Sequence, residues 1–185
     1  MMMRREPGIC APDTKNAQNV TAGCGGKGAD WSSWPWLRKK IWKGRKKIMK
    51  AAVVYWSGTG NTAAMADLVL EGMQSTGAQA DLLECNSVTD LSGYDAIAFG
   101  CPAMGSEQLE DSEFEPMFDS VKKNLSGKKI ALFGSYGWGD GEWMRNWEDD
   151  CRACGIKLAC ESVLANGAPE GADAEACREL GKALV

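Results

Sequence analysis

The feature that most constrains the fold is the alternation of short apolar segments with helical patterns that begins near residue 50. The first segment, KAAVVYW at residues 50–56, is nearly continuous in apolar residues, which is typical of a strand buried on both faces. We predict strands at residues 50–56, 78–85, 94–101, 128–136 and 156–165. We predict helices that start at Asn61 and end before Thr76-Gly77, and then at residues 114–125, 141–154 and 173–185. Strands that alternate with helices indicate an α/β fold with a doubly wound parallel sheet and helices on both faces.

The first 48 residues differ from the remainder in charge. They hold eleven Lys and Arg against three Asp and Glu, whereas residues 49–185 hold ten against twenty-two, so the net charges are +8 and −12. This split indicates a basic, disordered or irregular extension at 1–48 followed by a domain at 49–185. The extension carries the segment WSSWPWLRKKIWKGRKK and has two interpretations. It is a basic-aromatic segment for membrane surfaces, although Pro35 interrupts its aromatic cluster. Alternatively, the start of the chain is assigned too early and the native start is Met49.

Composition narrows the chemistry. The chain has no histidine, so the most common general base is missing and the chemistry is expected to belong to a bound cofactor. The eight cysteines include only one close pair, Cys151 and Cys154, which predicts reduced thiols in a cytoplasmic protein and no zinc or iron–sulfur site. No apolar run is long enough for a membrane span, and the N-terminus lacks the apolar region of a secretory signal. The acidic domain is expected to bind no nucleic acid.

The first predicted strand is followed by a loop of small hydrogen-bonding residues, SGTGNT at residues 57–62. Its glycines allow the backbone to fold closely around an anion, and the helix that follows directs its positive end toward the loop. The loop has no lysine, so it is not a Walker loop, and dipoles rather than cations would neutralise a phosphate.

The same loop permits a second interpretation. Gly58, Gly60 and Ala63 match a dinucleotide fingerprint, and Glu84 follows about twenty residues later near the end of the second predicted strand. This alternative, an NAD-binding module, does not explain the next two loops.

Two further loops follow predicted strands. In the loop at residues 101–107, Met104 offers a polarisable thioether that can lie on a flat ring, and Gly105 permits more than one peptide orientation. In the loop at residues 134–141, Trp138 stands between glycines, where it suits an aromatic platform for a ligand. Ligands of parallel sheets bind beyond the carboxyl ends of the strands, where these loops meet.

The segments YWSGTGNT (55–62), GCPAMGSE (100–107) and GSYGWGDGEWM (134–144) together resemble the flavodoxins, in particular the short-chain type of anaerobic bacteria. The resemblance extends from about Met49 to the C-terminus. It implies a five-stranded parallel sheet of order 2-1-3-4-5 with FMN at the switch point. It also implies a low-potential one-electron carrier rather than an enzyme; the alternative is an FMN-dependent quinone or NAD(P)H reductase of the same fold.

The resemblance further implies the roles of individual residues. The FMN phosphate would be held by Ser57, Gly58, Thr59, Gly60, Asn61 and Thr62. Met104 and Trp138 would lie on the two faces of the isoalloxazine ring. Contacts to the ring edge would come from Ala103, Gly105, Ser106, Glu107, Ser135, Tyr136, Gly137 and Gly139, with a weaker match at Asn166. The Gly105–Ser106 peptide would reorient toward flavin N5 on one-electron reduction. No catalytic residue and no metal ligand are expected.

The resemblance and the charge of the domain also predict its partners. We expect a monomer that docks on basic surfaces of redox proteins such as ferredoxin- and flavodoxin-type oxidoreductases, with weak and salt-sensitive contacts.

Overall fold

The computed structural model describes residues 49–185, and the predictions made for residues 1–48 lie outside that part. Five strands form one sheet in the order β2-β1-β3-β4-β5, and every neighbouring pair is parallel. The strands are β1 (Lys50–Tyr55), β2 (Gln79–Glu84), β3 (Ala96–Gly100), β4 (Lys129–Tyr136) and β5 (Val163–Asn166). The prediction of a doubly wound sheet of order 2-1-3-4-5 is therefore confirmed.

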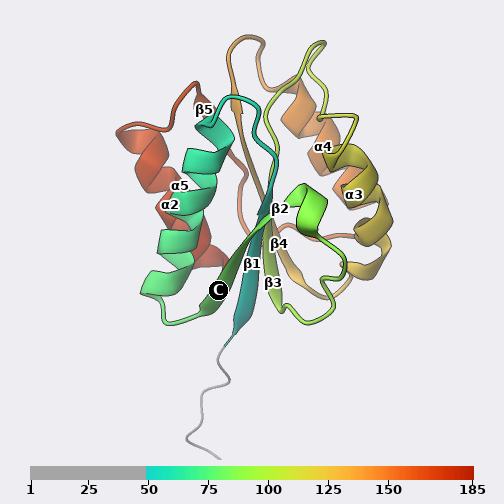
Figure 1. Cartoon of the computed structure of the whole chain (residues 1–185), viewed down its shortest axis with the longest axis vertical. Helices are drawn as coiled ribbons and strands as arrows, with labels where there is room; N and C mark the ends of the chain where they lie inside the picture. The colour runs from blue at the N-terminus through green and yellow to red at the C-terminus, as the bar shows by residue number, and fades with distance from the viewer. Residues whose placement is uncertain (1–48) are drawn as a thin grey trace, which may run out of the picture. The chain divides into compact units, whose positions relative to one another are not determined.

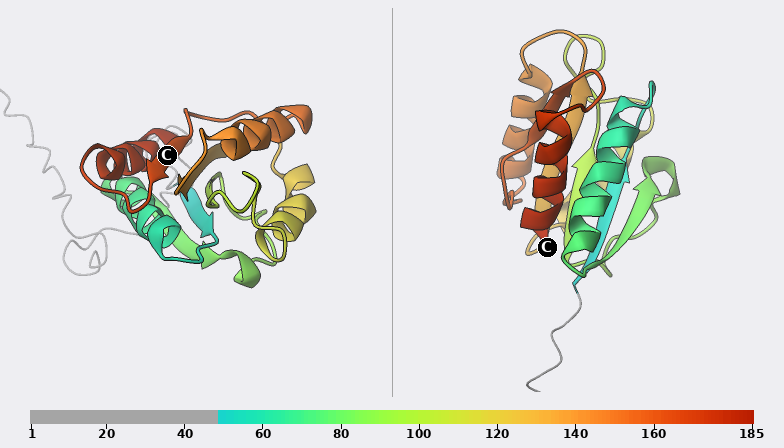
Figure 2. Two further views of the ribbon diagram at one scale, coloured as in Figure 1. Left: turned by 90° about the horizontal axis from the view of Figure 1, so that it is seen from above. Right: turned by 90° about the vertical axis from the view of Figure 1, so that its left-hand side faces the viewer.

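Two helices cover each face of the sheet (Figures 1 and 2). Helices α2 (Asn61–Ser75) and α5 (Ala172–Leu184) lie side by side on one face, and α3 (Phe114–Val121) and α4 (Glu142–Ala153) lie on the other. Short 3₁₀ helices follow β2 at Cys85–Ser87 and α3 at Lys122–Asn124.

Alternate residues of the central strands fill two separate cores. In β1, Val53 is buried in the core under α2 and α5, whereas Val54 is buried in the core under α3 and α4. The second core contains most of the large aromatic side chains: Phe99, Phe114, Phe118, Trp143 and Trp147. Because both faces are covered, β1, β3 and β4 read as continuous apolar runs, while the edge strand β2 is partly exposed.

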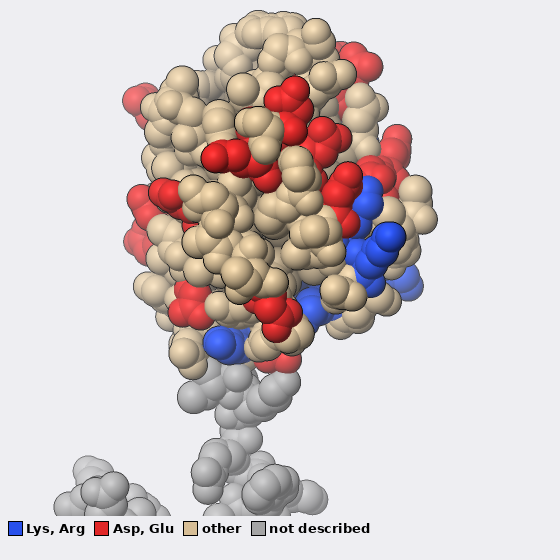
Figure 3. Space-filling view, turned by 45° about the vertical axis from the view of Figure 1, so that its right-hand side comes forward, with Lys and Arg blue, Asp and Glu red and all other residues tan. Residues whose placement is uncertain are grey.

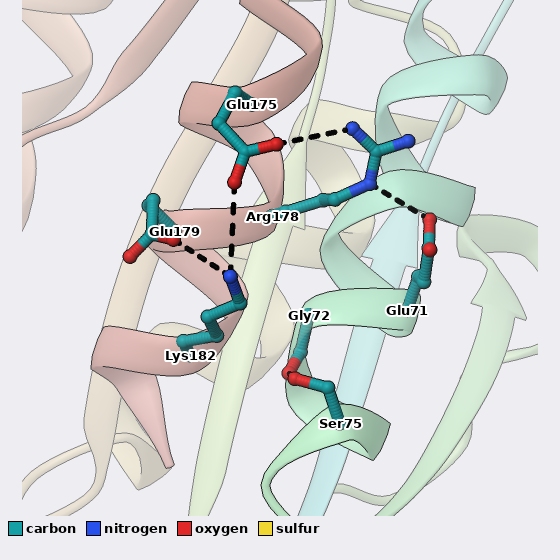
Figure 4. A network of polar contacts seen from close by, with 7 residues as sticks. All are labelled: Glu71, Gly72, Ser75, Glu175, Arg178, Glu179 and Lys182. Carbon is teal, nitrogen blue, oxygen red and sulfur yellow. Dashed lines mark hydrogen bonds and ion pairs between the residues drawn. The ribbon is translucent and has the colours of Figure 1, made fainter.

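Ion pairs join α2 to α5 at the surface (Figure 4). Arg178 Nε lies 2.9 Å from the carboxylate of Glu71 on α2, and its other end contacts Glu175. Lys182 pairs with Glu179 at 2.7 Å on the same helix. Exposed pairs of this kind contribute at most about 1 kcal/mol each, so the apolar contacts beneath them hold the two helices in place.

The structure corrects two predicted boundaries. The predicted strand at 156–165 pairs regularly only over β5, because four residues of β4 (130–133) span the same length as six residues of the partner (158–163). The two extra residues bulge out and end the pairing. The predicted helix at 114–125 keeps its α-helical form only to Val121 and then tightens into a 3₁₀ turn. No helix among residues 49–185 is long and apolar enough to cross a membrane.

Candidate functional site

A cavity of about 340 Å³ lies at the carboxyl ends of β1, β3 and β4, where the order of the strands reverses. This volume falls in the range of small-molecule sites. It is lined by residues of all three loops singled out from the sequence: Trp56, Gly58, Thr59, Asn61, Pro102, Ala103, Met104, Ser135, Tyr136, Gly137 and Trp138, together with Gly167 after β5. The fold thus brings together three segments that lie far apart in the chain.

The first loop presents backbone N–H groups at the start of α2. Gly60 is the residue before the helix and has φ 91°, a conformation that glycine adopts without steric cost. The hydroxyl of Ser57 accepts a hydrogen bond from the Gly60 N–H at 3.1 Å, and no side chain of the N-cap residue caps α2. Thr62 Oγ1 lies 3.1 Å from Ser135 Oγ in a buried contact that joins this loop to β4. Helix N–H groups without a side-chain cap suit an anion.

The second loop is a tight turn. Met104 donates its N–H to the carbonyl of Gln108 at 2.8 Å, so the chain reverses over Gly105, Ser106 and Glu107. Ser106 and Glu107 have φ angles of 63° and 48°, whereas Gly105 lies outside the left-handed region and a Cβ there would meet nothing within 4 Å. The backbone strain of this turn therefore lies on Ser106 and Glu107 and not on Gly105.

Glu107 joins the second loop to the third. Its carboxylate accepts hydrogen bonds from the backbone N–H groups of Asp140 at 2.8 Å, Trp143 at 3.3 Å and Glu142. A carboxylate at this position complements the positive end of α4. Within residues 49–185 the only grouping of potential metal-ligating side chains is Glu107, Asp140 and Glu142, and the Glu107 carboxylate in it is already hydrogen-bonded to backbone.

The third loop carries the most exposed large apolar side chain of the described chain. Trp138 is 61% exposed, whereas Trp143 and Trp147 in α4 are buried. Met104 and Trp138 both line the cavity, so a flat ring placed there has a thioether and an indole within reach.

The predicted site residues fall into two groups. Nine of the sixteen line the cavity: Gly58, Thr59, Asn61, Ala103, Met104, Ser135, Tyr136, Gly137 and Trp138. Seven lie in the same three loops but outside its lining: Ser57, Gly60, Thr62, Gly105, Ser106, Glu107 and Gly139. Asn166, the weaker match, is not among the lining residues, but its neighbour Gly167 is, and the Gly167 N–H donates to the carbonyl of Tyr136 at 2.8 Å.

Sequence reasoning missed Trp56 and Pro102. Trp56 was assigned to the end of a strand, although it stands directly before the phosphate-type loop, and that adjacency was the available signal. Pro102 was quoted within the second loop but given no role.

The cavity lining contains no lysine, arginine, aspartate or glutamate. The thiol of Cys101, the residue that follows β3, is buried; burial raises its pKa and so favours the protonated form. The six cysteines of the described chain are all free. The lining offers hydroxyl and amide groups for hydrogen bonds and aromatic and thioether surfaces for a flat ring, without a carboxylate, ammonium or guanidinium group, so the arrangement suits the binding and orientation of a ligand.

Comparison with known proteins gives a consistent result. A family described as flavodoxin matches residues 53–181. A flavodoxin of Megasphaera elsdenii is 46% identical over 138 residues, which are 72% of this chain and 96% of that protein. A flavodoxin of Clostridium beijerinckii is 42% identical over 135 residues, covering 72% of this chain and 97% of that protein. The solution structure of two-electron reduced Megasphaera elsdenii flavodoxin superimposes with a TM-score of 0.68, covering 72% of this chain and 97% of that one.

Proposed function

The chain belongs to the flavodoxin family, whose members are FMN-binding electron carriers, and we propose that the cavity at the strand ends is its FMN site. The loop from Ser57 to Thr62 would hold the FMN phosphate, and Met104 and Trp138 would contact the two faces of the isoalloxazine ring. The remaining residues of the second and third loops contact the edge of the ring. The single observation that carries this assignment is one cavity that unites the three loops at the point where the strand order reverses.

The residues present fit FMN. The N–H groups at the start of α2 suit the phosphate, and the exposed Trp138 supplies a flat surface for the ring. When bound, FMN supplies a one-electron redox couple that no side chain of this chain offers. The reductase and NAD-binding alternatives are not favoured, because the relatives that match nearly over their full length are flavodoxins.

The electrostatics favour a low potential. No cation lines the cavity, and Glu107, Asp140 and Glu142 have carboxylate oxygens within 4.8 Å of one another in the adjoining loops. Negative charge that develops in such a cavity on reduction is poorly compensated, so the reduced cofactor is a strong electron donor.

The surface charge sets the kind of partner. Carboxylates are spread over much of one face of the domain, while the Lys and Arg atoms visible there gather toward one lower edge (Figure 3). We infer that a monomer in the cytoplasm docks through its acidic surface on basic surfaces of redox proteins.

Two measurements test the proposed function. Purified protein reconstituted with FMN should show a flavin spectrum that changes stepwise on reduction, and it should not turn over NADPH with a quinone. Electron-transfer rates with a basic redox protein such as cytochrome c should fall as ionic strength rises. Failure to bind FMN under any condition contradicts the site, and a flat or rising salt dependence contradicts the docking mode.

A further inference from the structure

Trp56 connects the FMN cavity to a second, smaller cavity. It is the first residue after β1 and lines the cavity of about 340 Å³. It also lines a polar cavity of about 120 Å³ together with Ser57, Glu84 and Glu113. Its indole Nε1 donates a hydrogen bond of 2.8 Å to Glu113 Oε2, across 57 positions of sequence. Trp56 therefore stands between the phosphate loop and the segment that leads into α3.

The indole ring of Trp56 lies against the phosphate loop. A Cβ added to Gly58 would come within 2.9 Å of Cη2 and 3.2 Å of Cζ3 of this ring. Gly58, Thr59 and Gly60 are exposed, and the loop has one internal side-chain hydrogen bond, from Gly60 N–H to Ser57 Oγ. With so few other contacts, the position of the loop backbone depends on the ring beneath it.

The backbone of Glu113 is held in place by the side chain of Glu110. The carboxylate of Glu110, which is only 4% exposed, accepts hydrogen bonds from the N–H groups of Glu113 at 2.9 Å and Phe114 at 2.8 Å. The N–H of Glu110 donates to Cys101 Sγ at 3.4 Å, which closes the second loop. The Trp56–Glu113 hydrogen bond thus joins the phosphate loop to the rigid base of the loop that carries Met104.

We propose that Trp56 and Glu113 are positioning residues that hold the phosphate loop in its binding geometry and so set the preference of the protein for FMN over riboflavin. Riboflavin has the same ring and ribityl chain but no phosphate, so it gains nothing from correctly placed N–H groups in the loop. The inference rests on the proposed FMN site. The inference extends the proposed site by assigning selectivity for the phosphate to two residues. Trp56 lines the cavity, and Glu113 lies outside it.

The test compares the dissociation constants of FMN and riboflavin for variants of the full chain. Glu113→Ala removes the acceptor, and Trp56→Phe removes the N–H together with the Cη2 and Cζ3 atoms that lie against Gly58. Glu113→Ala should raise the Kd for FMN about five-fold, the effect of one hydrogen bond of about 1 kcal/mol, and Trp56→Phe should raise it at least as much; each should leave the Kd for riboflavin within about two-fold. The double variant should be no worse than Trp56→Phe alone, because that variant already lacks the bond. Glu113→Gln, which keeps an acceptor oxygen, should bind FMN as the original protein does.

Glu115→Ala is the matched control, since it removes an exposed carboxylate from the first turn of α3. It should leave the ratio of the two dissociation constants unchanged. The ¹⁵N–¹H signal of the Trp56 indole should shift in Glu113→Ala protein without any flavin, which shows loss of the bond independently of binding. Equal weakening of FMN and riboflavin, additive effects in the double variant, or unchanged FMN affinity overturns the inference. If the original protein binds no FMN at all, the proposed function itself fails.

Discussion

Replacing Trp138 by alanine should weaken FMN binding without unfolding the protein. Trp138 is 61% exposed, so of the about 250 Å² that a tryptophan can bury, about 150 Å² remain open. A ring stacked on one face covers about half of this area, or about 75 Å², which corresponds to about 2 kcal/mol at about 25 cal/mol per Å². Aromatic stacking adds about 1 kcal/mol beyond area. The sum of about 3 kcal/mol predicts a rise of about 100-fold in the Kd for FMN.

Titration of apoprotein with FMN, followed by quenching of flavin fluorescence, measures this change. Trp138→Phe should fall between the original protein and Trp138→Ala, because a smaller aromatic face remains. Leu82→Ala is the matched control, since Leu82 is the other exposed large apolar side chain of the described residues and lies on the edge strand β2. The stability of the apoprotein in urea should change little for either residue. A Kd for Trp138→Ala within about three-fold of the original value would refute the stacking argument.

Two further predictions concern the loops. Gly139→Ala should destabilise the protein by about 1–3 kcal/mol in urea, because Gly139 has φ 90° and its Cβ would overlap Oε1 of Glu107; Gly137→Ala, where a Cβ meets nothing within 4 Å, should change stability by less than about 1 kcal/mol. Burial alone would raise the pKa of Glu110, but hydrogen bonds from Ser112 and from backbone N–H groups outweigh it and lower that pKa below 4.5. The ionised Glu110 carboxylate therefore stabilises the folded protein above about pH 4.5, and this stabilisation is lost as the pH falls through the lowered pKa of the folded state. The urea midpoint of Glu110→Gln protein should consequently fall less steeply with decreasing pH than that of the original protein.

The fold could be predicted from the sequence where a strand is buried on both faces and therefore consists of consecutive apolar residues. The strands β1, β3 and β4 are buried on both faces, so their apolar runs marked them without ambiguity. The last strand was predicted too long, because the largely apolar IKLAC was joined to VLA although Glu161 and Ser162 interrupt the pattern just before regular pairing begins at Val163. Periodicity records which residues are buried, but it does not record whether a backbone N–H finds a partner in the next strand.

The site was predictable where loop composition was unusual and less so where a side chain acts across the fold. Gly58 stood out because it belongs to a loop made only of small hydrogen-bonding residues, and Trp138 because it stands between glycines with little local packing to explain it. Glu107 was expected at the edge of the ring, but nothing in the sequence indicated that its carboxylate accepts hydrogen bonds from the start of α4 more than thirty positions away. The partnership of Trp56 with Glu113 has no local sequence signal, because it depends on where the fold places the residue before α3 relative to the residue after β1.

A phosphate site without cations separates two electrostatic tasks. If a lysine held the phosphate, its charge would also stabilise negative charge in the cavity and would oppose the acidic surface that meets a basic partner. N–H groups at the start of α2 act over a short distance and are directed at one place, so in the proposed site they would hold the phosphate without placing a cation in the cavity. If the loop from Ser57 to Thr62 holds the phosphate as proposed, one small domain can retain an anionic cofactor and still present an acidic face to a basic partner.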